Sequence, residues 1–211
     1  MKDQLSSLQI SAFTQELISK APVPGGGGAA ALIGALASAL GGMAAGLTIG
    51  KKKFLPYEED HRRMIEETEA LRLRLLELMD EDAAAFEPLS RIYSLDKTSP
   101  GYAEKLETAT LDACKAPFEM MERCCRLIKI REELRDKCSV LLLSDVGCAA
   151  LAARCALEAA SMNVFVNTRM LPGCAEADDL SARAGAMLRD YIPRAQTVAD
   201  SVMEYLQTPK K

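Results

Sequence analysis

The chain has 211 residues, of which 49% are hydrophobic and 27% are charged, and its formal net charge is −4. This length and composition suit one globular domain covering residues 1–211, and the negative charge argues against non-specific binding to nucleic acid. Aromatic residues make up only 5% of the chain and Trp is absent, so the core must consist mainly of Ala, Leu and Met. Because these residues favour helices over strands, we predict an all-α bundle of about six mostly long, kinked helices.

The apolar periodicity predicts where these helices begin and end. In chain order we expect helices over residues 5–20, 29–50, 57–94, from about 101 to 134, 138–166 and 175–206. Prolines lie inside three of them, and we expect bends at Pro88 and Pro117 and an interruption at Pro193. No stretch alternates with period two, so we expect no sheet.

The termini and cysteines predict a compartment. No apolar signal segment follows Met1, and seven cysteines are an odd number for a disulfide framework. We therefore expect reduced thiols and a cytoplasmic protein. No spacing typical of a zinc site occurs, so we expect no metal and no cofactor beyond a substrate.

The most unusual stretch is Pro22–Gly28, in which four glycines precede a run without charge from Ala29 to Gly50. We expect these glycines to form a loop, using positive φ, that leads into a helix built of small residues. The N–H groups and dipole of such a helix start suit an anion. Two other interpretations remain open: close helix packing by small residues, and a membrane span, which the weak hydrophobicity of Gly, Ala and Ser argues against.

Two carboxylates lie at apolar positions of their predicted helices. Asp82 shares a helical stripe with Leu75, Leu78 and Met79, and Asp145 lies in a nearly uncharged segment. A carboxylate among apolar side chains tends to have a raised pKa or a cationic partner, and both are common in active sites. The structural alternative is that each bonds a helix end or an arginine.

Several further polar residues are candidates for binding. Asn163 and Asn167 share a helix face, where they would either contact one ligand or bond neighbouring helices. Lys51–Lys53 follow a helix end and would either be solvated or bind an anionic tail. His61, the single histidine, lies in a charged stretch that we expect to be exposed.

The chain resembles the cyclodeaminase/cyclohydrolase family of tetrahydrofolate enzymes. The resemblance covers essentially the whole chain and is carried by Ala21–Gly28 continued through Leu47–Phe54, by Asp82–Phe86, and by Ser144–Gly147 leading to Ala160–Asn167. It implies an all-helical homodimer that binds folate near the subunit interface, including polyglutamated folate. It also resembles a stand-alone member, without a formiminotransferase domain.

This resemblance implies hydrolysis of 5,10-methenyltetrahydrofolate to 10-formyltetrahydrofolate. The alternatives are deamination of 5-formimidoyltetrahydrofolate and a non-catalytic helical module that binds folate or dimerises. Both reactions need an acid and a base, roles that we assign as a hypothesis to Asp82 and Asp145. The expected binding residues are Ser144 beside Asp145, Asn163 and Asn167 at the pterin, and Pro24, Gly25, Gly26, Gly27, Gly28, Lys51, Lys52 and Lys53 at the glutamate tail. No nucleic acid or membrane partner is expected.

Overall fold

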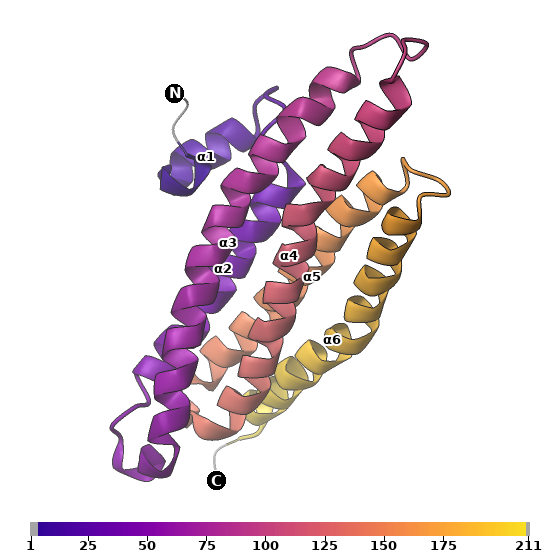
Figure 1. The fold of residues 1–211 in the computed structure, drawn as a ribbon. Coiled ribbons are helices and arrows are strands. Elements are labelled where there is room, and N and C mark those ends of the chain that lie inside the picture. Colours follow the sequence, from indigo (N-terminus) through magenta and orange to yellow (C-terminus); the bar gives the residue numbers. More distant parts are fainter. Residues whose placement is uncertain (1–3, 210–211) are drawn as a thin grey trace.

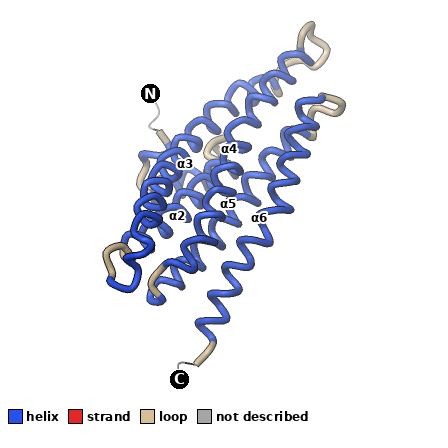
Figure 2. The backbone as a smooth tube through the Cα atoms, turned by 60° about the horizontal axis from the view of Figure 1, so that its bottom comes forward, coloured by secondary structure: helices blue, strands red, loops and turns tan. Residues whose placement is uncertain are grey.

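The structure is a computed structural model that describes residues 4–209, and Figure 1 shows a bundle of long helices. The α-helices are α1 (Ile10–Leu17), α2 (Gly26–Gly46), α3 (Glu58–Ile92), α4 (Tyr102–Lys137), α5 (Leu143–Thr168) and α6 (Ala175–Gln207). Short 3₁₀ turns η1 (Leu5–Ser7), η2 (Lys52–Tyr57) and η3 (Val140–Leu142) precede α1, α3 and α5. The described residues contain no strand, as Figure 2 shows, so the predicted all-α class is confirmed.

Three predicted boundaries need correction. The first predicted helix is split into η1 and the short helix α1. Helix α2 begins at Gly26, inside the glycine run, so three of the four glycines are helical rather than part of a loop. Helix α6 continues through Pro193 without interruption, as α3 and α4 continue through Pro88 and Pro117.

The core lies between α2, α3, α4, α5 and α6, where small and flexible apolar side chains pack closely. Helix α2 contributes mainly Ala and Gly to this core, α3 and α4 contribute Leu and Met, and α5 contributes Ala, Leu and Val. Helix α2 packs against both α3 and α5, and α5 also packs against α4 and α6. The small side chains of α2 and α5 let these helices approach closely, which explains the low aromatic content.

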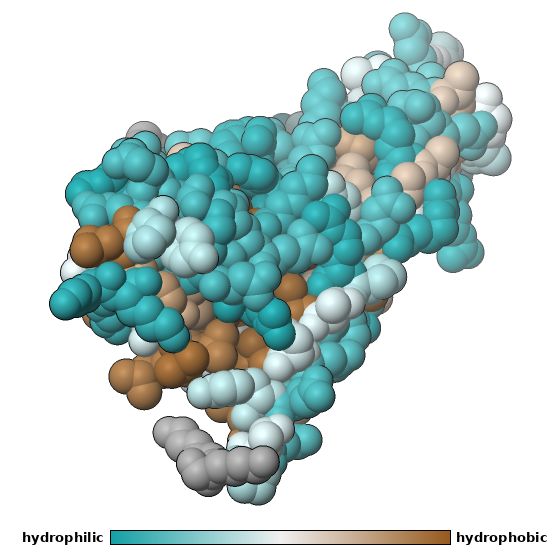
Figure 3. All heavy atoms as spheres, turned by 90° about the horizontal axis from the view of Figure 1, so that it is seen from below, coloured by the Kyte–Doolittle hydropathy of each residue, from teal (hydrophilic) through white to brown (hydrophobic). Residues whose placement is uncertain are grey.

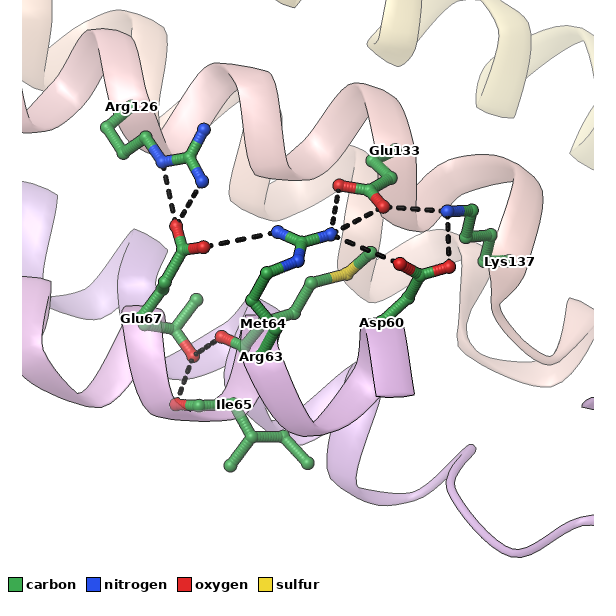
Figure 4. Close-up of polar contacts among 9 residues, drawn as sticks. Asp60, Arg63, Met64, Ile65, Glu67, Arg126, Glu133 and Lys137 are labelled. Carbon is green, nitrogen blue, oxygen red and sulfur yellow. Dashed lines mark hydrogen bonds and ion pairs between the residues drawn. The ribbon is translucent and has the colours of Figure 1, made fainter. Parts of the chain in front are cut away.

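An ion-pair network joins α3 to α4 (Figure 4). Arg63 on α3 donates to both carboxylate oxygens of Glu133 on α4, at 2.6 and 2.7 Å, and Lys137 bridges Glu133 and Asp60. The same Arg63 reaches Glu67, which pairs with Arg126 on α4. A connected network of this kind constrains register better than isolated surface pairs do. It therefore helps to fix where α3 carries Asp82.

His61 is buried rather than exposed, which corrects the expectation from its charged surroundings. One ring nitrogen, Nε2, lies 2.7 Å from the carbonyl oxygen of Lys137, the last residue of α4. With Nε2 protonated, the imidazole donates to a carbonyl that the end of α4 leaves without a helical partner. His61 is therefore a helix cap, not a catalytic base.

Candidate functional site

The first turn of α2 forms one end of the bundle and contacts two of the predicted site residues. Gly25 is the N-cap in an extended conformation, and the buried Pro24 precedes it. No residue of Gly25–Gly28 has a positive φ, so the glycines are not needed for a left-handed turn. The contacts that these glycines make with neighbouring helices are therefore what distinguishes them.

The side chain of Asp82 occupies the space that a Cβ atom on Gly27 would need. A Cβ atom built on Gly27 would lie 2.3 Å from Asp82 Oδ2 and 2.6 Å from Oδ1, which is much closer than real contacts allow. The carboxylate on α3 therefore lies directly against the backbone at the start of α2. A glycine also lets another part of the chain approach the backbone closely, and at Gly27 that part is the Asp82 carboxylate.

Asp82 has the electrostatics of a general base. The side chain is partly buried on the apolar stripe of α3, and this burial raises the pKa of its carboxyl to about 6, with no charged or hydrogen-bonding neighbour in residues 4–209 offsetting it. The group is therefore mainly ionised at pH 7 yet more basic than an ordinary aspartate. The predicted apolar position of Asp82 is confirmed. The structural alternative was a bond to a helix end or an arginine: within residues 4–209 the carboxylate lies against the start of α2 but forms no hydrogen bond there and no ion pair with an arginine.

Asn163 on α5 also lies beside the first turn of α2. Its amide lies against Gly26, where a built Cβ would be 3.4 Å from Oδ1, an ordinary contact distance. Its Nδ2 donates to the carbonyl oxygen of Ala159 at 2.9 Å, and both amide atoms lie near Gly26. Asp82, Asn163 and the first turn of α2 thus form one cluster from three helices, which we call the glycine end.

Asn167 does not join this cluster as a free amide. Its Nδ2 donates to the carbonyl oxygen of Ala113 on α4 at 3.1 Å. That carbonyl has no helical donor because the residue four positions later is Pro117, which lacks an N–H group. Asn167 therefore satisfies a buried acceptor between helices, as the alternative interpretation held, and the prediction that it presents its amide to a pterin is not supported.

The remaining predicted residues form a second cluster, the lysine end. Asp145 and Ser144 lie in the first turn of α5, and Lys51–Lys53 are exposed after the end of α2. The backbone N–H of Ser139, just before α5, donates to Thr48 Oγ1 just after α2, so these two groups of residues lie at the same end of the bundle. Asp145 is only partly buried, and its place at a helix N-terminus is favourable for a carboxylate without any catalytic role.

Within one chain the two clusters are far apart. Asp145 and Asn163 are separated by about 27 Å along α5 at 1.5 Å per residue, and α2 separates Gly26 from the lysines by about 30 Å. Asp82 and Asp145 therefore do not form a catalytic pair in a single chain, and the glycines and lysines do not bind one tail there. The sequence pattern therefore identified the residues of the glycine end and of the lysine end, but not the distance between them.

A groove of about 770 Å³ on the outer side of α3 and α4 contains none of the predicted site residues. It is lined by residues such as Ala85, Pro88, Lys105 and Asp112, with Glu81 next to Asp82 in sequence at its edge. Its lining combines apolar side chains with scattered charges of both signs. We take the glycine end as the candidate site because it holds Asp82, whose pKa is raised by burial, against the start of a helix. Residues 4–209 hold no group of three or more His, Cys, Asp or Glu side chains arranged for a metal ion.

The chain is similar to known proteins along most of its length. The family model for formiminotransferase-cyclodeaminase matches residues 9–186. The chain belongs to this family. It is 36% identical over 189 residues to the methenyltetrahydrofolate cyclohydrolase of Methylorubrum extorquens, covering 84% of this chain and 91% of that protein. The resemblance stated from the sequence is therefore confirmed.

More distant relatives show how the family fold recurs in larger proteins. The formimidoyltransferase-cyclodeaminase of Rattus norvegicus is 27% identical over 95% of this chain, which spans 38% of the rat protein. A crystal structure of formiminotetrahydrofolate cyclodeaminase from Thermotoga maritima superposes with a TM-score of 0.83 at 24% identity, covering 94% of this chain and 99% of that one. At this identity the match supports the fold.

Proposed function

We propose that this member of the formiminotransferase-cyclodeaminase family hydrolyses 5,10-methenyltetrahydrofolate to 10-formyltetrahydrofolate. The observation that carries the proposal is the Asp82 carboxylate, whose pKa is raised by burial and which lies against the backbone of Gly27 at the start of α2. The similarity to the Methylorubrum cyclohydrolase along nearly the whole of both chains supports this choice of reaction.

Hydrolysis of 5,10-methenyltetrahydrofolate requires a base that is ionised near neutral pH. The bridging carbon of the methenyl substrate is an electrophilic amidinium carbon, and water adds to it as Asp82 accepts one of the water protons. The bond from this carbon to N5 then breaks as N5 is protonated, the hydroxyl proton is lost, and one proton is released in the net reaction. The Asp82 carboxylate also stabilises the positive charge that develops on the attacking water oxygen before its proton is transferred. No metal or redox group is needed for these steps.

Cyclodeamination is the second candidate. The rat relative carries cyclodeaminase in its name, and the same base and acid would serve attack by N10 and departure of ammonia. Loss of the methenyl absorbance when the protein is added to 5,10-methenyltetrahydrofolate supports hydrolysis. Appearance of that absorbance from 5-formimidoyltetrahydrofolate, with ammonia release, supports deamination. If the protein accelerates neither change, both catalytic proposals are wrong and a binding module remains.

We further propose a homodimer that forms through α2 and α5. These are the most apolar helices of the chain, and by length and composition each could cross a membrane, yet only 56% and 44% of their most apolar windows are buried. Their exposed large side chains lie in one stripe on each helix: Leu36, Met43 and Leu47 on α2, and Leu151, Met162 and Val166 on α5, with exposed Cys148 and Cys155 between them. We call this surface the α2/α5 face.

The α2/α5 face is suited to a second copy of the chain. Apolar side chains gather on one side of the molecule in Figure 3, the side away from the viewer in Figure 1, where α2 and α5 lie. The charged residues among these positions, Arg154 and Glu158 on α5, are half-buried and pair with each other, so the face carries no uncompensated charge, and a two-fold dimer places an identical surface opposite it. A helix that is apolar on all sides is expected to be buried on all sides.

The dimer is tested by light scattering coupled to gel filtration. We expect the wild-type mass to be twice 22.9 kDa and Leu151→Asp to shift it to that of one chain, because the substitution places a charge at the centre of the face. Leu73→Asp, at an exposed position of α3, is the matched control and should stay dimeric. A wild-type monomer, or membrane association of the wild type in a vesicle flotation assay, contradicts the proposal.

A further inference from the structure

The N-terminal segment of the chain lies beside the end of the bundle that holds Asp82. Its two short elements, η1 and α1, lie outside the long helices on the side of α3 (Figure 1), and the chain then leads through Pro24 to the start of α2. We call residues 4–24 the N-terminal strap. Its contacts with α3 and α2 indicate what it does for the site.

Asp80 on α3 anchors the beginning of the strap. Its carboxylate accepts a hydrogen bond from the backbone N–H of Leu5 at 2.6 Å and one from the hydroxyl of Ser6 at 2.5 Å, and the Ser6 N–H adds a longer contact at 3.4 Å. Because successive residues of a helix are rotated by about 100°, Asp80 and Asp82 leave α3 in nearly opposite directions. Asp80 therefore faces the strap, whereas Asp82 faces the start of α2.

The strap also contacts the first turn of α2. A Cβ atom built on Gly28 would lie 3.4 Å from Pro24 Cβ and 3.9 Å from Phe13 Cζ, so both side chains pack at this turn. Met79 Cγ on α3 lies 3.7 Å from the same position, and Met79 precedes Asp82 by about one helical turn on the same face. The strap therefore packs within about one helical turn of the Asp82 carboxylate.

Few other contacts hold α1 in place. Phe13 is its one buried side chain, whereas Ile10 and Ile18, at its two ends, are 68% and 80% exposed. Apolar burial alone therefore contributes little to keeping α1 docked. The position of Phe13 depends on the hydrogen bonds to Asp80 at one end of the strap and on the entry into α2 at the other.

We propose that Asp80 is a positioning residue for the reaction: it holds the strap, so that Phe13 and Pro24 stay packed at the start of α2 and keep water from the Asp82 carboxylate. Asp80 does not touch the reacting atoms in this role, because it acts through the strap. The inference rests on the proposed function, in which Asp82 is the base.

This cover matters because burial is what raises the pKa of Asp82 to about 6. On α3, Glu81 is exposed and pairs with an arginine, and the carboxylate of Asp80 faces the strap. The start of α2 and the nearby amide of α5 carry no charge, and the charged residues of the strap, Glu16 and Lys20, are exposed. Release of the strap would therefore lower the pKa of Asp82 towards 3.8, and a weaker base accelerates the reaction less.

Hydrogen exchange and a carboxyl titration test both parts of the proposal without using activity. In Asp80→Ala we expect faster hydrogen–deuterium exchange over residues 5–17 than in the wild type. We also expect the titration midpoint of Asp82, followed by ¹³C NMR of labelled aspartate carboxyls and assigned with Asp82→Asn, to fall by about one pH unit or more. Ser6→Ala, which removes one donor and keeps every charge, should shift both measurements less in the same direction, and it decides the test if Asp80→Ala does not fold.

Two further variants separate the strap from the charge of Asp80. Phe13→Ala keeps Asp80 and should also lower the titration midpoint of Asp82. Glu81→Ala removes a neighbouring negative charge without touching the strap, and as the matched control it should leave both measurements unchanged. The proposal is overturned if exchange in the strap is not faster when its anchor is removed, if exchange is faster but the midpoint stays, or if Glu81→Ala lowers the midpoint as much as Asp80→Ala does.

Turnover links the cover to the reaction. In Asp80→Ala the acid limb of kcat/KM should move to lower pH together with the carboxyl midpoint, and kcat above this limb should fall by about tenfold, because the base is weaker. An acid limb that stays where it is in the wild type overturns the positioning role. If the wild type converts neither 5,10-methenyltetrahydrofolate nor 5-formimidoyltetrahydrofolate, the proposed function is wrong, whereas exchange and titration still decide whether the strap held by Asp80 covers Asp82.

Discussion

At the residue scale, Asp82 links the sequence to the chemistry. Its position on the apolar stripe of α3 can be recognised from Leu75, Leu78 and Met79, and the structure accounts for its raised pKa by burial. The catalytic use that we propose for this carboxylate conflicts with the stability of the fold, because an ionised carboxylate is partly removed from water without a cation. Two predictions follow from this single group.

Replacing Asp82 by Asn should reduce kcat by about 10²–10⁴-fold, the usual contribution of a general base. In the wild type, kcat/KM should fall as the pH drops below about 6, because protonation of Asp82 removes the base. A pH–rate profile measured on the methenyl absorbance checks both. A profile that is flat through pH 6 would show that Asp82 does not act as the base.

The same substitution should stabilise the protein at pH 7. The pKa of Asp82 is about 6 in the folded chain and 3.8 ordinarily, so the folded state favours the protonated form, and stability is lost as the pH rises from about 4 to above 6. Asn removes this loss, and allowing for partial exposure we expect a gain of about 1–2 kcal/mol at pH 7 and almost none at pH 4. Urea unfolding at the two pH values measures the difference. An equal effect at both pH values contradicts the assignment.

At the element scale, the glycines of α2 leave room for side chains of the neighbouring helices. A Cβ atom on Gly41 would lie 1.9 Å from Arg131 Cζ, and this fully buried guanidinium reaches the carbonyl oxygens of Ala37 and Ser38 on the same helix. Its Nε and Nη1 have no partner in the described chain, and burial lowers the pKa of Arg131 to about 10. Gly41 is therefore a packing glycine, as the small-residue interpretation of the sequence allowed.

Gly41→Ala should destabilise the fold by about 2 kcal/mol or more, because the core is overpacked against Arg131. Adding Arg131→Met should recover most of this loss, since a shorter, uncharged side chain makes room for the methyl group. Gly46→Ala on the same helix is the control: no atom lies within 4 Å of its built Cβ, so we expect no loss or a small gain. Thermal unfolding of the wild type, Gly41→Ala, Arg131→Met and the double variant gives the coupling, and additive effects would rule out the proposed contact.

Asn167 and Pro117 give a second prediction at this scale. Asn167→Ala should cost about 1–3 kcal/mol of stability, because the buried carbonyl of Ala113 loses its donor. In Pro117→Ala the helix supplies that donor itself, so Asn167→Ala should cost much less in this background. A double-mutant cycle by urea unfolding measures the difference. Equal costs in the two backgrounds would mean that Asn167 does not compensate for the proline.

At the scale of the whole molecule, the bundle leaves its two most apolar helices half covered. If a second copy covers the α2/α5 face, folding and association are linked, and the unfolding midpoint should rise with protein concentration. Leu151→Asp should abolish this dependence and lower the midpoint, whereas the Leu73→Asp control should keep the dependence. Thermal unfolding over a hundredfold range of concentration checks this, and a midpoint that does not move for the wild type argues against the dimer.

The sequence by itself determined the helical class, the positions of the long helices within a few residues, the family, and the unusual placement of Asp82. These features depend on local periodicity and composition, which the chain carries wherever it folds. Only the tertiary structure decided that Gly27 makes room for a carboxylate, that Asn167 compensates for Pro117, and that the glycine and lysine ends lie a helix length apart. Such facts depend on which residues distant in sequence meet in space, and periodicity along one helix does not contain that information.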